Sequence, residues 1–270
     1  MSNYSLPLSV IKISGEDAAT FLQGQLTQDI TSLDEQWRYA AQCNPQGRVV
    51  AFFISFKHQG NLYLITDQNS CDKTISQLQK YVMRSKVTIT KLEEAVYFIE
   101  KENNDTELKV QSHGTNISLS TQTGDLFISS EEAANDHNFS SVNAWQQANI
   151  KNGIPFLRGK TLEKFTPEAI NLDLLGAVSF SKGCYTGQEI VARMHYLGKA
   201  KKRLFITNII GNIDDIGVGD NITDQEGKTI GHLVDFEKDG NALISIKVTA
   251  EPAFNKNKKT IQSINNELLL

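Results

Sequence analysis

The most informative segment of the sequence is Lys182-Gly183-Cys184-Tyr185-Thr186-Gly187-Gln188-Glu189, which precedes Ile190-Val191-Ala192-Arg193-Met194. Two glycines bracket one cysteine, and glycine lets the backbone adopt positive φ and approach a partner closely. An accessible cysteine beside Lys182 would be favoured as a thiolate. The same residues also fit a turn that enters a helix at about Gly187 around a small buried cysteine. For an isolated cysteine this second interpretation is favoured, because no lone cysteine specifies chemistry.

Together with other segments, the octapeptide resembles the signature of the YgfZ family of folate-binding proteins. These proteins are relatives of the glycine-cleavage T-protein and of a mitochondrial iron–sulfur assembly factor. The resemblance spans at least residues 10 to 205, with motifs in the expected order at 21–27 with Asp29, 43–48, 165–168, 171–173, 190–193 and 197–199. It implies an α+β, T-protein-like fold, whose subdomains surround a central opening in which folate sits, with a small β-barrel at the C-terminus.

Periodicity and turn residues give a local interpretation that agrees with this fold. A short strand at 10–13 is followed by a helix start with Ser14 as N-cap. Strands at 37–43, 48–56 and 62–66, joined by short turns, predict an antiparallel meander. Helical spacing follows at 75–82 and again at 142–150. Short strands with regular turns run from 202 to 248 and indicate a small β-barrel or sandwich that begins near residue 198. Together with the resemblance, this implies a folate-binding, T-protein-like region of two intertwined α+β subdomains in residues 1–197 and a C-terminal β-barrel domain in residues 198–270.

Composition excludes several classes of protein. The 270 residues allow two or three subdomains, and 40% hydrophobic with 21% charged residues suits a soluble globular protein. The net charge of −4 gives no global case for nucleic-acid binding, which would need a local patch. The sequence has no apparent secretory signal and no apolar run of membrane-spanning length. Cys43, Cys71 and Cys184 are odd in number and far apart, so we expect a reduced, cytoplasmic protein. We also expect it to be a monomer.

The resemblance implies tetrahydrofolate, or a derivative of it, as the cofactor. Folate is a flat polar pterin joined to an aryl ring and an anionic glutamate tail. A site for it needs an apolar slot, a carboxylate or amide facing the pterin edge, and cations for the tail. The candidate folate-binding residues are Gln23, Gln25, Arg48, Glu163, Glu168, Tyr185 and Arg193. The sequence alone does not show that they converge.

Two departures from the T-protein pattern bear on activity. In an ungapped comparison, the catalytic aspartate of T-proteins falls at Thr74, and a folate-region glutamate falls at Lys151. A hydroxyl cannot supply the negative charge that an aspartate offers to a proton or a developing cation. We therefore expect no aminomethyl transfer and no classical enzyme activity. The alternative is a folate-dependent one-carbon transferase or demethylase that uses another carboxylate, such as Asp72 or Glu168.

The signature cysteine is absent from T-proteins and implies an added role in this family. The resemblance implies participation in the synthesis or repair of iron–sulfur clusters, with folate and client enzymes or assembly proteins as partners. Clients would include tRNA-modifying methylthiotransferases. Cys184 would be the reactive thiol, with Lys182 tuning its pKa, and it would bind iron or a thiol partner transiently. One thiolate cannot hold a cluster alone, so we expect no resident metal site.

Two small basic clusters remain, Lys199, Lys201, Lys202 and Arg203 in one and Lys256, Lys258 and Lys259 in the other. Such runs are usually solvated faces. We therefore expect no direct contact with tRNA and no membrane contact, and a weak phosphate-binding or tRNA-contact role is the minor alternative.

Overall fold

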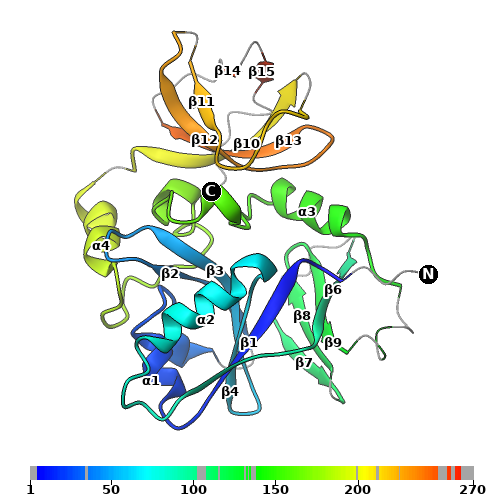
Figure 1. The fold of residues 1–270 in the computed structure, drawn as a ribbon, viewed down its shortest axis with the longest axis vertical. Coiled ribbons are helices and arrows are strands. Elements are labelled where there is room, and N and C mark those ends of the chain that lie inside the picture. The colour runs from blue at the N-terminus through cyan, green and yellow to red at the C-terminus, as the bar shows by residue number, and fades with distance from the viewer. Residues whose placement is uncertain are drawn as a thin grey trace.

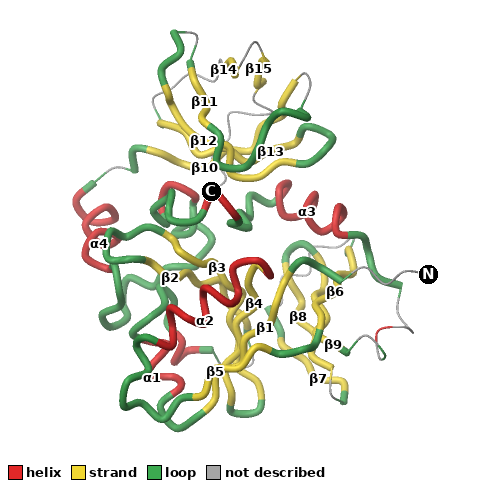
Figure 2. Tube along the Cα trace, viewed as in Figure 1, coloured by secondary structure: helices red, strands yellow, loops and turns green. Residues whose placement is uncertain are grey.

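Three antiparallel sheets and a few short helices make up the structure (Figures 1 and 2). It is a computed structural model that describes residues 5–33, 36–101, 108–114, 116–130, 132, 134, 138–198, 200–210, 213–224, 226–248, 254–256 and 259–262. None of the helices in this part of the chain is long and apolar enough to cross a membrane.

The first sheet has five strands in the order β2-β3-β4-β1-β5. They are β1 (Leu8–Ser14), β2 (Trp37–Cys43), β3 (Val49–His58), β4 (Asn61–Asp67) and β5 (Thr88–Lys91). The predicted meander is confirmed, with Phe56 opposite both Trp37 and Tyr63. Strand β1 lies between β4 and β5, a placement that depends on pairing between segments distant in sequence.

Both faces of this sheet are buried. Successive side chains of a strand point to opposite faces, and the neighbours Phe52 and Phe53 of β3 belong to different hydrophobic clusters. Phe53 shares its cluster with residues of α1 (Ala18–Gln23) and α2 (Cys71–Gln79). Phe52 packs edge-on against Phe156, with ring centroids 5.5 Å apart. The helices therefore cover one face, and the chain around residue 156 covers the other.

The start of α1 differs from the prediction. Ser14 is the last residue of β1 rather than a cap, and the helix begins after Asp17. Gly15 intervenes with φ +116°, which turns the chain out of the strand. The Asp17 carboxylate accepts a hydrogen bond from the Lys86 amide at 2.7 Å, so it holds a neighbouring loop instead of capping the helix.

The second sheet has four strands in the order β6-β9-β8-β7. They are β6 (Ala95–Glu100), β7 (Val110–His113), β8 (Asn116–Thr121) and β9 (Gly124–Ser129). Short strands joined by turns therefore make up this region. Leu6 donates its amide to the Val96 carbonyl at 2.7 Å, which joins the N-terminal segment to β6.

The third sheet forms the C-terminal end of the molecule, at the top of Figure 1. Its order is β11-β12-β13-β10-β15-β14, and its strands are β10 (Lys202–Ile210), β11 (Asn221–Thr223), β12 (Thr229–Phe236), β13 (Asn241–Lys247), β14 (Phe254–Lys256) and β15 (Lys259–Gln262). The edge strands β11 and β14 approach each other, but within the described residues no ladder joins them. The expected barrel is therefore a curled sheet.

The chain between α3 (Val142–Lys151) and α4 (Gln188–Leu197) docks this third sheet onto the rest. Asn171, in the left-handed conformation at φ 56°, donates its amide to the Leu204 carbonyl at 3.0 Å and accepts from the Leu204 amide at 3.2 Å. Both carboxylate oxygens of Asp173 accept from Arg203, at 2.6 and 2.9 Å. One hydrophobic cluster includes Leu172 and Leu204, so it runs across position 198. The boundary between the two domains stays a prediction.

Asp235 of β12 forms a second link between the third sheet and the rest of the protein, this time to Arg158 and α3. Its carboxylate is buried, with 3% of the side chain exposed, and accepts from the Arg158 guanidinium at 2.7 and 3.2 Å. The side-chain amide of Gln146 on α3 also donates to it at 2.9 Å. Removing one partner of such a pair leaves the other charge buried without compensation.

We expect Asp235→Ala to lower the free energy of unfolding by about 3 kcal/mol, because Arg158 and Gln146 lose their acceptor. Urea unfolding followed by tryptophan fluorescence measures it, since Trp145 lies on α3. The matched control is Asp239→Ala in the exposed turn between β12 and β13, which should change stability by less than about 0.5 kcal/mol. Equal stability of the two variants would contradict the structural role of Asp235.

Candidate functional site

The signature loop is anchored by the ammonium of Lys182. The side chain is buried, and its Nζ donates to the carbonyl oxygens of Gln23 at 2.6 Å, Leu26 at 2.6 Å and Gln28 at 3.0 Å. An ammonium has three donors, so all of them are used on backbone carbonyls. Burial lowers the pKa of Lys182 to about 8, and the charge of Asp29 opposes that shift. The tuning of Cys184 by Lys182 stays a prediction, because the ammonium is engaged with the segment 23–28.

The thiol of Cys184 is exposed, whereas those of Cys43 and Cys71 are buried. The interpretation of Cys184 as a small buried side chain is therefore wrong. A Cβ added at the neighbouring Gly183 would meet nothing within 4 Å, so the backbone is open there too. Cys184 lines neither of the two cavities described below; from the same loop, Thr186 lines the smaller one.

The predicted turn into a helix at Gly187 is confirmed, and two glycines explain its position. Helix α4 begins at Gln188, and Gly187 has φ +83°. A Cβ on Gly187 would lie 2.4 Å from the Asn44 carbonyl, and one on Gly47 would lie 2.9 Å from the Ile190 side chain. Only glycine allows this approach, so the signature loop and the 44–47 turn are packed directly onto each other.

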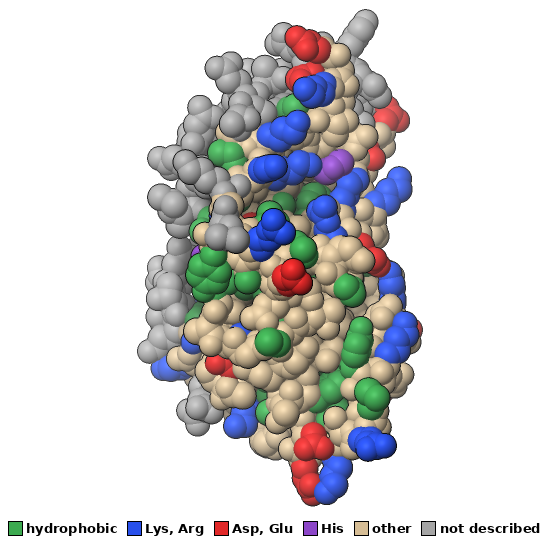
Figure 3. Space-filling model, turned by 90° about the vertical axis from the view of Figure 1, so that its left-hand side faces the viewer, with side chains coloured by type: hydrophobic (Ala, Val, Ile, Leu, Met, Phe, Trp, Pro, Cys, Tyr) green, Lys and Arg blue, Asp and Glu red, His purple; other side chains and the backbone are tan. Residues whose placement is uncertain are grey.

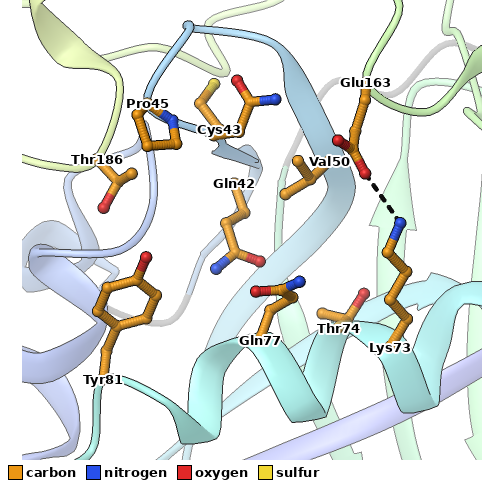
Figure 4. A pocket seen from close by; sticks show the side chains of 11 residues that line it. Gln42, Cys43, Pro45, Val50, Lys73, Thr74, Gln77, Tyr81, Glu163 and Thr186 are labelled. Carbon is orange, nitrogen blue, oxygen red and sulfur yellow. Dashed lines mark hydrogen bonds and ion pairs between the residues drawn. The ribbon is translucent and has the colours of Figure 1, made fainter.

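The smaller cavity lies between α2 and the strands β2 and β3 and has a volume of about 100 Å³ (Figure 4). Its lining residues are Gln42, Cys43, Asn44, Pro45, Val50, Lys73, Thr74, Gln77, Tyr81, Glu163 and Thr186. Lys73 and Glu163 form an ion pair of 2.9 Å at its side, and this hydrogen bond and charge lower the pKa of Glu163. Gln42 is 4% exposed, and its Oε1 has no hydrogen-bond partner among the described residues. That oxygen is available to a ligand.

The larger cleft has a volume of about 580 Å³, within the range of small-molecule sites. It lies between the turn before β3, the start of η5 (Glu168–Ile170), helix α4 and the start of β10. Its lining residues are Gln46, Arg48, Thr166, Ala169, Ile190, Arg193, Met194, Gly198, Lys201 and Lys202. Four of these carry a positive charge, and none carries a negative charge.

Three buried titratable side chains influence one another: Cys43, Glu168 and Tyr185. Burial raises the pKa of Glu168 to about 7, and neither carboxylate oxygen makes a hydrogen bond of ordinary geometry with a described residue. Burial and the charge of Glu168 raise the pKa of Cys43 to about 12. Burial, Cys43 and Glu168 raise the pKa of the Tyr185 phenol. Cys43 and Tyr185 therefore stay protonated at neutral pH, whereas Glu168 titrates near neutral pH.

The candidate folate residues therefore lie in different surroundings. Glu163 lines the smaller cavity, Arg48 and Arg193 line the larger cleft, and Glu168 and Tyr185 are buried. Gln23 binds Asp29 at 3.0 Å and the Ile30 amide at 2.8 Å, which fixes the segment after α1. The buried Oε1 of Gln25 has no hydrogen-bond partner within the described residues. Their role in folate binding stays a prediction.

Sequence reasoning missed several residues that the structure places in cavities. Gln42, Lys73, Gln77 and Tyr81 line the smaller one, and Lys201 and Lys202 line the larger one. One signal was present for Gln42, a long polar side chain between Ala41 and Cys43 in a mostly apolar strand. The basic run around Lys201 was noted in the sequence, but no local sequence feature shows whether such a run lines a cleft or faces solvent. No group of three His, Cys, Asp or Glu side chains that could hold a metal ion occurs in the part of the chain that the structure describes.

Known proteins similar in sequence include three called "tRNA-modifying protein YgfZ". That of Hamiltonella defensa subsp. Acyrthosiphon pisum is 30% identical over 268 residues, covering 88% of this chain and 77% of the relative. The chain belongs to the YgfZ family. The relative from Vibrio atlanticus is 31% identical over 74% of this chain and 67% of its own length, and that from Yersinia enterocolitica is 30% identical over 76% and 72%. No protein-family model matches the chain.

A solved structure similar to this YgfZ-family chain is the glycine cleavage system aminomethyltransferase T from Bartonella henselae. The TM-score is 0.77, and the match covers 96% of this chain and 83% of the other. The sequences are 14% identical, so the likeness concerns the fold alone. It confirms the predicted α+β, T-protein-like fold.

We expect Lys182→Met to lower the free energy of unfolding of this YgfZ-family protein by about 3 kcal/mol, because three buried carbonyls lose their donor. Chemical denaturation of the purified variant measures it. Lys80→Met, at the exposed end of α2, is the matched control and should change stability by less than about 0.5 kcal/mol. If both variants unfold at the wild-type denaturant concentration, the anchoring role of Lys182 is wrong.

Proposed function

We propose that this protein is a folate-binding accessory factor that supports iron–sulfur enzymes in tRNA modification. The name "tRNA-modifying protein" carried by its relatives supports the tRNA part. The resemblance of residues 182–189 to the family signature supports the folate and iron–sulfur parts. The observation that carries the proposal is an exposed thiol, Cys184, on a loop whose neighbouring residues are fixed by Lys182 and Gly187.

The chemistry proposed for Cys184 is transient binding of iron or of a thiol on a partner protein. An exposed cysteine can reach a partner, whereas the buried Cys43 and Cys71 cannot. A cluster normally needs about four protein ligands, and no set of three candidate metal ligands occurs among the described residues. The protein would therefore act on iron or clusters that a client enzyme also holds, and not as a storage site.

The smaller cavity fits folate in chemistry but not in size. The unpartnered Oε1 of Gln42 could accept from a pterin edge, and Gln77 and Tyr81 add an amide and a ring. Its volume of about 100 Å³ is below the roughly 300 Å³ at the lower end of ligand sites. Whole folate would need this cavity to widen. We assign folate a binding role here and no chemical step.

The alternative, a one-carbon transferase or demethylase, needs a carboxylate near the ligand. Asp72 has 85% of its side chain exposed and lies 3.4 Å from Lys91. Glu168 lines neither cavity, while Thr74 lines the smaller one with a hydroxyl. No observation of these side chains favours the alternative over the accessory role.

We expect Cys184→Ala to abolish support of methylthiotransferase-dependent tRNA modification in cells that lack the native protein. Modified nucleosides quantified by mass spectrometry give the readout. Stability should change by less than about 0.5 kcal/mol because the side chain is exposed, and Cys184→Ser tests whether sulfur itself is needed. Ser32→Ala, at an exposed site, is the control. Full support by Cys184→Ala would refute the proposed role of the thiol.

We expect Gln42→Leu to weaken tetrahydrofolate binding about tenfold while stability is unchanged or raised. A leucine fills the space without leaving an unpaired buried oxygen, and it cannot accept a hydrogen bond from the pterin. Calorimetric titration and thermal unfolding measure the two effects, with Gln59→Leu in an exposed turn as the control. Recovered tetrahydrofolate should be chemically unchanged; robust methylene-tetrahydrofolate formation from an aminomethylated lipoyl carrier would support the transferase instead.

A further inference from the structure

The larger cleft has a concentration of positive charge that the thiol chemistry does not use. Arg48 and Arg193 are candidates for the folate tail, but Lys201 and Lys202 are not. Arg48, Arg193, Lys201 and Lys202 line the cleft, and none of the ion pairs within the described residues involves these four side chains. On the face shown in Figure 3, Lys and Arg side chains gather around a histidine in the upper half of the molecule. The cleft is therefore a local positive patch on a protein whose net charge is −4.

Two further cations, Lys164 and Lys247, lie close enough to Lys202 of the cleft to influence its pKa. Burial lowers the pKa of Lys202, and three neighbouring cations lower it further: Lys247, Arg48 and Lys164. Burial and the charges of Lys164 and Lys202 lower the pKa of His232 to about 4, so this ring is neutral at physiological pH. The fold thus holds like charges close together at a cost in stability, which a bound anion would offset.

Backbone carbonyls, and not carboxylates, hold two of these cations in place. Arg48 donates to the Lys164 carbonyl at 2.9 Å, and Lys164 donates to the Gly219 carbonyl. Neither side chain forms an ion pair within the described residues, and both have further N–H donors. Arg203, which is next to Lys202 in sequence, differs because Asp173 neutralises it. The cations that line the cleft thus have no carboxylate partner within the described residues, whereas the neighbouring Arg203 has one.

One exposed aromatic ring lies near a cation of the cleft. Tyr196 is 65% exposed and lies three residues after Arg193 on α4, a spacing that places both on neighbouring parts of one helix face. Unpaired cations with an exposed ring nearby are a combination that binds a nucleic-acid strand, through phosphates and base stacking.

We propose that this cleft binds the phosphate backbone of RNA, with tRNA as the ligand to test. Cations on α4, the 44–48 turn and the third sheet offer several separate contacts, as a phosphate chain requires. The expectation of no direct tRNA contact treated the run around Lys201 as a solvated face, whereas Lys201 and Lys202 line this cleft. The inference goes beyond the proposed function and needs neither folate nor Cys184.

The experiment measures binding of total tRNA by fluorescence anisotropy over a salt series. The variant is Lys201→Gln/Lys202→Gln, and the matched control is Lys228→Gln/Lys238→Gln, two exposed lysines in turns of the same sheet. Removing two phosphate contacts should weaken binding roughly 25- to 60-fold at about 0.1 M salt. The slope of log affinity against log salt should become less steep by about two. Arg193→Gln, exposed on α4, tests the same cleft if the double variant is unstable.

Wild-type affinity and salt slope in the control, together with their loss in both cleft variants, support the proposal. Equal tRNA binding by wild type, cleft variants and control overturns it, as does the absence of tRNA binding by the wild type. Polyglutamylated tetrahydrofolate is the competing anion and is titrated in parallel. If the cleft variants lose preference for the polyglutamyl form while tRNA affinity is unchanged, the cleft holds a folate tail and the RNA proposal is wrong. Retained tRNA binding by Cys184→Ala separates this result from any failure of the thiol role.

Discussion

The buried ammonium of Lys182 is the contact on which the arrangement of the site depends. It joins the signature loop to three carbonyls of the segment 23–28, which lies more than a hundred residues earlier in the chain. The same segment is tied a second time, because the Thr27 hydroxyl donates to the Ala177 carbonyl at 2.6 Å. A buried charge without compensation is costly, so the loop and this segment are stable only together. The exposure of Cys184 follows from where this anchor places the loop.

Several residues that read as functional motifs have a structural role. Asn171 and Asp173 dock the third sheet through Leu204 and Arg203. Gly47 and Gly187 let two backbone segments touch. Such residues set the positions of the cavities without lining them, and their replacement would affect activity through the fold. Family motifs therefore contain both residues that stabilise the site and residues that line it. The structure is needed to tell the two kinds apart.

Sequence reasoning succeeded where structure is set locally. The turn chemistry at 44–47 and the strand runs on each side gave the β2–β3–β4 meander, and Gly187 gave the start of α4. It failed where long-range pairing decides, as in the insertion of β1 between β4 and β5. The same limit applies to the site. A polar side chain such as Gln23 or Arg48 can turn toward solvent, a backbone group or a cavity, and distant segments decide which.

The two cavities share the 44–48 turn as a wall yet differ in charge. Asn44 and Pro45 face the smaller one, where Glu163 neutralises Lys73, and Gln46 and Arg48 face the larger one, where no carboxylate balances the cations. Electrostatic influence decays over a Debye length of about 8 to 10 Å in physiological salt, so neighbouring sites can select different ligands whatever the net charge. Because Gly187 packs against this turn, a shift of the signature loop would displace a wall of both cavities. The contact between Gly187 and Asn44 thus joins the signature loop to the wall that the two cavities share.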